Sequence, residues 1–475
     1  MLWLYLHFPH LLLDHLQRSR KQKSAMVVIT ASGQHVQQAC PLAQKQGIEP
    51  GLRLKTALSL APDLATVQAD PEREQRILTQ QARWLYRHAA PITLYPPDGL
   101  LVEAGNLQRL YGDAGALWDQ LARLLAEHQL TASMAIGLTP RAARLCARAR
   151  RGCRDSGADP ALLETRLRAL SLEDAGFERR TLERLLRLGL TSLGDVFALP
   201  PTELARRLAP ETLAHVQKIQ GTRPDPQDIW QPPHRFEQQA DFIQNIERSE
   251  GLLFPLQRLL GELEADLQWR QQDTDRLLVV LHHHQPPATP VEIGATGPEH
   301  RTEAFLNLIR LRFEQQPLPS PVTALTLRVT RFLPRHAATT QDLLGDEPDL
   351  QEAWHTLISR LQMKLGASAL HRLAPQADHR PERAWVMQGL GPRRAGESAP
   401  ALPHHPARPL WLMSHPQSLQ EAPHEWLAGP ERISAGWWDG ERVHRDYYIA
   451  QMASGALAWV FRDVREGWFI HGWFG

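Results

Sequence analysis

Apolar and polar positions follow two different rhythms over residues 1–155. Short apolar runs, which are typical of buried strands, lie at residues 2–6, 25–30, 100–103 and 133–138. Apolar residues at three- and four-residue spacing predict helices over residues 50–63, 71–87 and 107–127. Because strands and helices mix within one stretch, the pattern predicts an α/β or α+β domain.

The pattern changes twice in the middle of the chain. Residues 160–221 contain no convincing strand, and glycine and proline divide them into short helices. Residues 222–233 are rich in proline and predict an extended linker. Residues 235–332 then predict the order strand, helix, strand, strand, helix, strand, which is typical of a ferredoxin-like sandwich.

The end of the chain is rich in tryptophan. A helix is expected over residues 350–365, and a proline-rich stretch follows to about Pro409. Residues 411–475 hold seven of the fourteen tryptophans, and strands are expected at residues 447–449, 457–462 and 468–474. These side chains either form the core of a small β unit, stack on bases or dock a partner. We expect a core, and a partner site on the same unit is compatible with it.

Composition excludes several classes of protein. The chain of 475 residues carries 53 basic and 52 acidic side chains, so its net charge of +1 favours no particular partner. Cys40, Cys146 and Cys153 form no Cys-x-x-Cys pair, which argues against a disulfide framework or a zinc ribbon and fits a cytoplasmic protein. The first residues lack the features of a signal peptide, and no apolar stretch is long enough to predict a membrane span.

A row of arginines is the first candidate for function. Arg141, Arg144, Arg148 and Arg151 follow one another at spacings of three, four and three residues, so on a helix they share one face. Like charges on one face repel, and a phosphate backbone is an obvious anion to offset them. The alternative is a solvated face with scattered acidic partners. We therefore interpret the row as a candidate DNA contact.

A second candidate is the turn Leu188-Gly189-Leu190 between two short predicted helices. This arrangement is typical of a helix-hairpin-helix motif, in which glycine lets the backbone approach a phosphate and helix-start N–H groups bind it. An ordinary helical hairpin is the alternative.

Carboxylates are scarce where a polymerase would need them. Two-metal phosphoryl transfer requires two or three carboxylates around a pair of Mg²⁺ ions. The first strand runs into His7-Phe8-Pro9 without an acid, and only Asp98 and Glu103 lie near the later strand. We expect Asp98, in Pro96-Pro97-Asp98-Gly99, to be a turn residue rather than a metal ligand. No metal site and no cofactor are predicted.

Several motifs carry a resemblance to a known family. They are Leu6-His7-Phe8-Pro9, residues 98–103 with 109–112, residues 136–140, the hairpin at 188–199 and the tail at 436–463. With them the chain resembles Y-family translesion DNA polymerases, and in particular the polymerase-like subunit of a bacterial damage-inducible mutagenesis complex.

The resemblance implies an α+β multidomain fold. It implies a palm and fingers at 1–158 (fingers about 20–75), a helical thumb at 159–221, a linker at 222–234, a ferredoxin-like little finger at 235–334, a linker with a clamp-binding segment and a helix at 335–410, and a small Trp-rich β region at 411–475.

Departures from the family pattern decide the expected activity. Active members carry an Asp where His7 or Pro9 falls, and an adjacent Asp-Glu pair where this chain has Asp98 and Gly99. Their fingers residues that hold the triphosphate align with Pro41 and Gln44. We therefore expect a polymerase scaffold without chemistry, because losing a metal-bridging carboxylate costs many orders of magnitude in rate. The alternative is an active Y-family polymerase with atypical ligands that include Asp98 and Glu103.

The resemblance also implies partners. It implies an adaptor, SOS-induced, in the cytoplasm at the nucleoid, that binds primer-template DNA without sequence preference and links the sliding clamp to an error-prone C-family polymerase and a RecA-like protein. The clamp-binding candidates are Thr340, Gln341, Asp342, Leu343 and Leu344, with residues 408–413 as a second choice. Trp411, Trp437 and Trp438 are the candidate partner-binding side chains.

Overall fold

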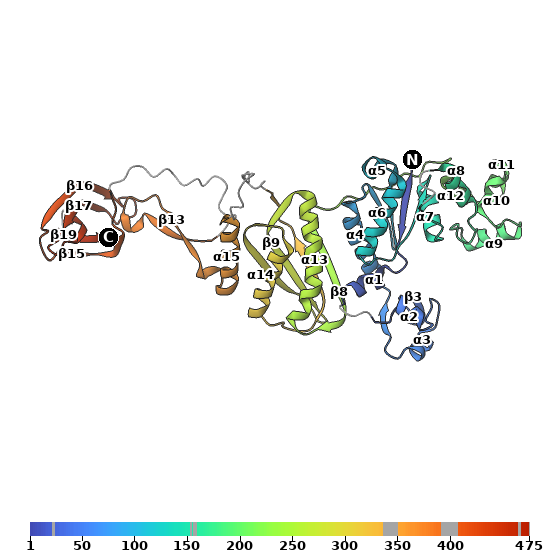
Figure 1. Ribbon diagram of the computed structural model, residues 1–475, viewed down its shortest axis with the longest axis horizontal. Helices are drawn as coiled ribbons and strands as arrows, with labels where there is room; N and C mark the ends of the chain where they lie inside the picture. The colour runs from blue at the N-terminus through green and yellow to red at the C-terminus, as the bar shows by residue number, and fades with distance from the viewer. Residues whose placement is uncertain are drawn as a thin grey trace. The chain divides into compact units, whose positions relative to one another are not determined.

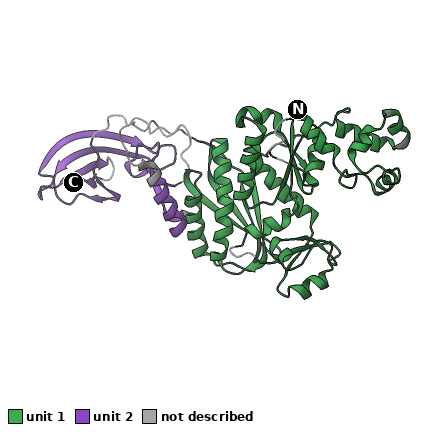
Figure 2. Ribbon diagram, turned by 45° about the vertical axis from the view of Figure 1, so that its right-hand side comes forward, with its two compact units in different colours: residues 1–347 green, residues 348–475 purple. Residues whose placement is uncertain are grey.

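The computed structural model describes residues 1–20, 24–152, 154, 159–335, 350–390, 407–463 and 467–474. The chain forms two compact units, residues 1–347 and 348–475 (Figure 2). Both units combine helices with antiparallel sheets, which confirms the predicted α+β class. Among the helices described, none has the length and apolar character needed to cross a membrane.

The central sheet of the first unit has the strand order β5-β6-β1-β7 (Figure 1). Its strands are β1 (Trp3–His7), β5 (Ile92–Tyr95), β6 (Gly99–Glu103) and β7 (Ser133–Gly137). The helices around it are α1 (Leu11–Arg18), α4 (Pro71–Tyr86), α5 (Ala104–Tyr111), α6 (Ala114–Glu127) and α7 (Pro140–Arg148). Side chains of β1 alternate between two cores: Leu4 and Leu6 join the core with α4 and α6, and Tyr5 joins the core with α7.

The helix predicted over 107–127 is two helices. Gly112 interrupts it with a φ of 94°, and the side chain of Asp113 accepts a hydrogen bond from the N–H of Ala116 to begin α6.

A small three-stranded sheet, with the order β3-β2-β4, follows α1 in sequence. Its elements are β2 (Met26–Ile29), β3 (Val36–Ala39), α2 (Pro41–Lys45), α3 (Leu54–Leu60) and β4 (Ala65–Gln68). The prediction of a helical stretch at residues 159–221 is confirmed, with helices α8 (Pro160–Arg168), α9 (Arg179–Arg187), α10 (Leu193–Ala198), α11 (Pro201–Arg207) and α12 (Pro210–Gln220).

The strand-helix order predicted for residues 235–332 is confirmed, with strands longer than expected. The elements are β8 (Phe236–Ile246), α13 (Ser249–Arg270), β9 (Gln272–His283), β10 (Thr289–Glu299), α14 (Thr302–Gln315), β11 (Val322–Val329) and β12 (Leu333–Pro334). The sheet order is β10-β9-β11-β8. A ferredoxin-like sheet has its first and third strands in the middle, whereas here the second and fourth, β9 and β11, are central. The first strand, β8, is therefore an edge strand, and its buried Asp241 lies 3.0 Å from Nε2 of His15 in α1.

The second unit contains more strands than the sequence predicted. Its elements are α15 (Leu350–Leu365), the short helices η2 (Ala367–Ala369) and η3 (Pro381–Arg383), the hairpin β13 (His371–Pro375) and β14 (Trp385–Gly389), and a sheet of β15 (Trp411–Ser418), β16 (Glu425–Ala435), β17 (Val443–Gln451), β18 (Leu457–Asp463) and β19 (Gly467–Trp473). The sheet order is β15-β19-β18-β17-β16. The three predicted strands are its central members.

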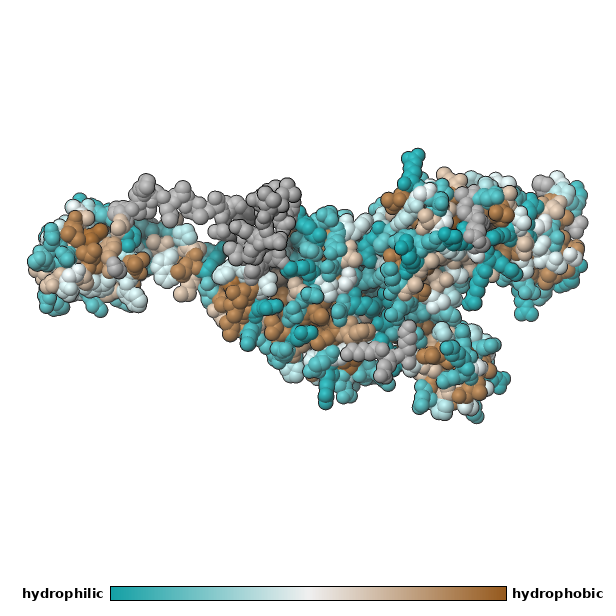
Figure 3. Space-filling model, in the orientation of Figure 1, coloured by the Kyte–Doolittle hydropathy of each residue, from teal (hydrophilic) through white to brown (hydrophobic). Residues whose placement is uncertain are grey.

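Only part of the tryptophan content forms the core of the second unit. Trp459 is buried and stacks on Tyr447, with ring centroids 4.0 Å apart. Apolar side chains also reach the surface of this unit (Figure 3), and Trp411, Trp437 and Trp438 are among the exposed ones. The interpretation of the tryptophans as core is therefore right for some and not for these three.

Tyr5 and Gly99 fit together in the central sheet. The two strands pair antiparallel, with Tyr5 opposite Leu101 and His7 opposite Gly99. A Cβ atom on Gly99 would lie 1.7 Å from the Tyr5 hydroxyl oxygen, so the tyrosine ring fills the space that a side chain at position 99 needs. The Tyr5 hydroxyl is buried and has no hydrogen-bond partner among the described residues.

This contact predicts that Gly99→Ala lowers the free energy of unfolding by about 1–3 kcal/mol, because the added methyl group overpacks a buried site. In a Tyr5→Leu background the same substitution is expected to cost much less, since the two residues compete for one space. Urea denaturation of the four proteins measures both effects.

Gly105→Ala is the matched control, because its Cβ would meet nothing closer than 3.5 Å. It lies in helix α5, where alanine is preferred to glycine, and no loss of stability is expected. Equal costs for Gly99→Ala with and without Tyr5 would contradict the packing argument.

Candidate functional site

The sequence-predicted positions His7, Asp98 and Gly99 meet at one end of the central sheet. His7 ends β1, Gly99 begins β6 opposite it, and Asp98 precedes Gly99. The N–H of Phe8 donates to the carbonyl of Asp98 at 2.8 Å, which holds the two chain segments together. Pro9 lies in the turn after β1. The structure therefore brings the motif positions His7, Asp98 and Gly99 together.

The Asp98 carboxylate is already engaged by cationic and polar side chains. Nε2 of His7 lies 3.2 Å from Oδ2, and Nη1 of Arg148 donates to Oδ1 at 3.0 Å. Nδ1 of His7 lies 3.4 Å from the Ser133 hydroxyl. Burial alone raises the pKa of Asp98, but the hydrogen bond from His7 and the charge of Arg148 outweigh it, so the pKa of Asp98 is lowered. The carboxylate is thus ionised and paired within the protein.

The neighbouring position in sequence supplies no second carboxylate beside Asp98, but Glu74 of α4 is buried, and burial and the charge of Asp98 raise the pKa of Glu74. Gly99 has no side chain, and Tyr5 occupies the space beside it. Glu103 is at the opposite end of β6, across from Trp3, and four residues of strand separate it from Gly99 by about 13 Å. Within the described residues, no group of three or more His, Cys, Asp and Glu side chains gathers in a way that suits a metal ion. The use of Asp98 and Glu103 as a shared metal site is therefore not compatible with this geometry.

The predicted arginine row is only partly free for DNA. Nε of Arg141 donates to Asp225 at 3.0 Å and its Nη1 lies 2.8 Å from Nδ1 of His215. The guanidinium of Arg144 lies over the ring of Tyr95, 5.0 Å from its centroid. Arg141 and Arg144 therefore have partners within the protein, and Arg148 is paired with Asp98.

Arg151 does not belong to the helix that carries the others. Helix α7 ends at Arg148, and Arg150 has a φ of 54°, which turns the chain away. The expectation of one continuous helical face is wrong for Arg151, because α7 ends at Arg148 and the chain turns at Arg150. Arg148 and Arg151 are both exposed at the surface.

The turn at residues 188–190 has the expected hairpin shape but few free donors. Gly189 has a φ of 79° with open space around its Cβ position, and Leu188 is exposed. The N–H groups of Gly189 and Leu190 bond to carbonyls of helix α9. At the start of α10, Asp195 accepts from the N–H groups of Thr191 and Ser192, both at 2.9 Å.

Those backbone hydrogen bonds lower the pKa of Asp195 to about 2. The carboxylate therefore occupies the anion position that a phosphate would take in such a turn. Contact of residues 188–190 with DNA remains a prediction, and it would have to use side chains rather than these amides.

The remaining candidates divide between the second unit and residues outside the structure. The clamp-binding candidates, residues 340–344, lie outside the described residues. Trp437 and Trp438 stand next to each other at 75% and 51% exposure, with ring centroids 5.4 Å apart. Trp411 is also exposed.

Arg380 is a residue that sequence reasoning missed. Its guanidinium bonds to Asp378 at 2.6 Å and to Asp439 at 2.5 Å, and lies over the ring of Trp438 at 5.7 Å. It therefore connects residues 378–380 to the turn that carries Trp437 and Trp438. Tyr5 was missed as well, because its hydrophobic neighbours made it indistinguishable from an ordinary core residue.

Comparison with known proteins agrees with this arrangement. The impB/mucB/samB family matches residues 12–148. Protein ImuB of two Caulobacter vibrioides strains, NA1000 / CB15N and ATCC 19089 / CIP 103742 / CB 15, is 27% identical to the chain in each case, over 90% of this chain and 100% of the relative.

Similar solved structures include a Y-family DNA polymerase chimera, Dbh-Dpo4(243-245)-Dbh, with a TM-score of 0.38, 13% identity and coverage of 69% of this chain and 98% of that chain. The insertion ternary complex of Dbh DNA polymerase has a TM-score of 0.39, 15% identity and coverage of 70% and 100%. By the family match and these relatives, the chain is similar to ImuB along most of its length.

Proposed function

We propose that this protein is a noncatalytic, DNA-binding adaptor of an SOS-induced translesion synthesis complex. The observation that carries the proposal is the pairing of Asp98 with His7 and Arg148. A two-metal centre needs several negative oxygens at this point, whereas Asp98 is paired with His7 and Arg148 of the protein itself and position 99 carries no acid. We infer that the polymerase-like fold is present without the negative charge that metal-dependent phosphoryl transfer requires.

The packing of Tyr5 against Gly99 supports the same proposal from sterics. A glutamate at position 99 would collide with the tyrosine ring, so the site is closed to a bridging carboxylate. In the small sheet, Gln44 donates to the carbonyl of Ala39 and Pro41 begins α2, so neither position offers a charge for a triphosphate. The proposed loss of the metal ligands and the proposed loss of the triphosphate contacts therefore support the same conclusion, a scaffold without catalysis.

DNA binding is supported by the exposed cations near this site. Arg148 and Arg151 are exposed, and the guanidinium of Arg144 lies over the ring of Tyr95. Contacts of arginine with phosphates give affinity without sequence preference. An adaptor that holds primer-template DNA in the cytoplasm, at the nucleoid, requires this kind of binding and no metal.

The proposed partners are those of ImuB-like proteins. They are the sliding clamp, through Thr340–Leu344, and an error-prone C-family polymerase and the RecA-like protein ImuA, through a surface with Trp411, Trp437 and Trp438. The exposure of all three tryptophans supports the second part, because large exposed aromatic side chains are typical of interaction sites.

Primer extension with the purified full-length chain and Mg²⁺ tests the absence of catalysis. No template-directed incorporation is expected from the natural protein. The double variant His7→Asp, Gly99→Glu is also expected to be inactive, because Tyr5 leaves no room for the new glutamate. A catalytically active Y-family polymerase under the same conditions is the positive control. Extension by the natural chain that Asp98→Ala abolishes would establish the alternative, an active polymerase with atypical ligands.

Salt titration of binding to primed DNA tests the proposed contact surface. The double variant Arg144→Gln, Arg151→Gln should bind more weakly, and its plot of log K against log salt should be shallower by about 2, one for each lost phosphate contact. Arg123→Gln with Arg310→Gln, two exposed helix residues elsewhere in the first unit, is the matched control. Equal slopes for both double variants would exclude this surface.

The variant Asp98→Asn distinguishes an adaptor from an active polymerase. It removes a negative charge and releases Arg148, so an adaptor should bind primed DNA more tightly than the natural chain. An active polymerase would instead lose its incorporation activity. Fluorescence anisotropy at fixed salt measures the affinity, and weaker binding by Asp98→Asn would contradict the proposal.

A further inference from the structure

Residues 236–270 are attached to the preceding helices by a surface of opposite charges. The acids come from β8 and α13, and their partners come from α1 and α4 and from the end of α6. The ion pairs are Asp266 with Arg83 at 2.7 Å, Glu262 with Arg87 at 2.9 Å and Asp241 with Arg73 at 3.3 Å. Ring nitrogens of two histidines also lie close to these acids, that of His128 3.2 Å from Glu262 and that of His15 3.0 Å from Asp241. Each of these acids has at least one cation within bonding distance.

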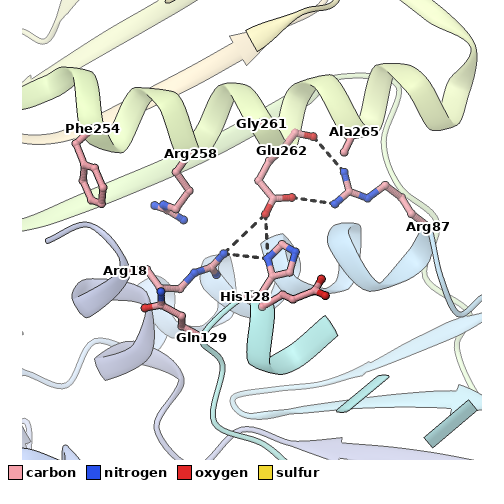
Figure 4. A pocket seen from close by; sticks show the side chains of 10 residues that line it. Arg18, Arg87, His128, Gln129, Phe254, Arg258, Gly261, Glu262 and Ala265 are labelled. Carbon is pink, nitrogen blue, oxygen red and sulfur yellow. Dashed lines mark hydrogen bonds and ion pairs between the residues drawn. The ribbon is translucent and has the colours of Figure 1, made fainter. Parts of the chain in front are cut away.

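Arg258 of α13 is the exception in this surface. Its Nε atom is buried and has no hydrogen-bond partner, and its Nη2 donates only to the Ser19 hydroxyl, at 3.4 Å. In Figure 4 it extends from α13 towards Arg18, and no hydrogen bond or ion pair joins it to the other residues drawn. Burial, followed by the charge of Arg18, lowers the pKa of Arg258. Among the described residues, this half-buried guanidinium has no ion-pair partner of its own.

Glu262 does not compensate Arg258. Its carboxylate accepts from Nη2 of Arg87 at 2.9 Å and lies 3.7 Å from Nη2 of Arg18 (Figure 4). Burial raises its pKa, but His128, Arg87 and Arg18 together lower the pKa of Glu262 to about 2. The Glu262 carboxylate is therefore shared by Arg87 and Arg18 and is not paired with Arg258. Asp241 is likewise engaged by His15 and Arg73.

An open cavity lies beside these side chains. Its volume is about 400 Å³, which is within the range of small-molecule sites. Arg18, Arg87 and Arg258 line it together with two glutamates, and Glu127, the second of these, is exposed to solvent. The buried part of the wall is therefore positive, with Phe254 at one side.

We propose that this cavity binds a phosphate group, with Arg258 as its principal contact. A guanidinium offers several N–H donors in a planar fork that matches the oxygens of a phosphate. A bound oxyanion supplies the counter-ion that Arg258 lacks, which removes the cost of a buried unpaired charge. The proposal is independent of DNA binding at α7, because none of the residues of that surface lines the cavity.

Inorganic phosphate is the first probe, titrated calorimetrically into the full-length chain without divalent metal and with ionic strength held constant by sodium chloride. The natural chain is expected to bind phosphate, and its thermal stability is expected to rise with the phosphate concentration. Arg258→Met, which keeps the length of the side chain, is expected to weaken binding at least tenfold. Arg310→Met, an exposed arginine of α14 outside the cavity, is the matched control and should bind as the natural chain does.

Arg258→Lys guards against misfolding, because it keeps the charge and loses only the planar fork. It is expected to bind phosphate several-fold more weakly than the natural chain and more tightly than Arg258→Met. If all three proteins bind phosphate equally, or if none binds it, the proposal is overturned.

Two further probes distinguish the source of the phosphate group. A deoxynucleoside triphosphate tests a free nucleotide, and a short oligo(dT) tests the backbone of a strand. Sensitivity to Arg258→Met for the triphosphate but not for oligo(dT) identifies a small-molecule site, and the reverse identifies a strand contact. If Arg258→Met changes the binding of neither probe while the α7 surface binds DNA normally, this inference is overturned and the proposed function is unaffected.

Discussion

The antiparallel pairing of β1 with β6 determines what the centre of the first unit can do. Its register sets His7 against Gly99 and brings Asp98 beside both, so one geometric relation creates the site and limits it. The same pairing places Tyr5 where a side chain at position 99 would stand. Electrostatics and packing thus act in one direction, because Asp98 is paired with His7 and Arg148 and position 99 has no space for a second carboxylate.

Much of the architecture follows from local pattern. The apolar runs at the start of the chain and near residues 100 and 136 are short and bounded by turn residues, and they form β1, β6 and β7. The helical stretch after residue 159 was equally clear because proline and glycine mark its ends. By contrast, β16 escaped prediction: its residues are mostly exposed and include Gly429-Pro430, so they show no alternation of apolar and polar side chains.

The site could be predicted only where its parts belong to a motif. His7, Asp98 and Gly99 were identified by their place in a family pattern, and the structure brings them together. Tyr5 was not identified, because 94 residues separate it from Gly99 and only the register of two strands makes them neighbours. Arg141 illustrates the reverse, since its spacing suggested a free cation while Asp225, 84 residues away, already holds it. Sequence spacing indicates which face a charge lies on, not which distant residue neutralises it.

The ion pairs of Arg380 have a consequence for recognition by the second unit. They connect η3 to the turn before β17 and lie against Trp438, so ion pairs tie down the turn that displays two large aromatic side chains. Immobilising a side chain on association costs about 0.5–1.5 kcal/mol. A partner of the proposed tryptophan surface would therefore meet a turn that ion pairs already restrain, and the entropy lost on binding would be smaller than for an unpaired loop.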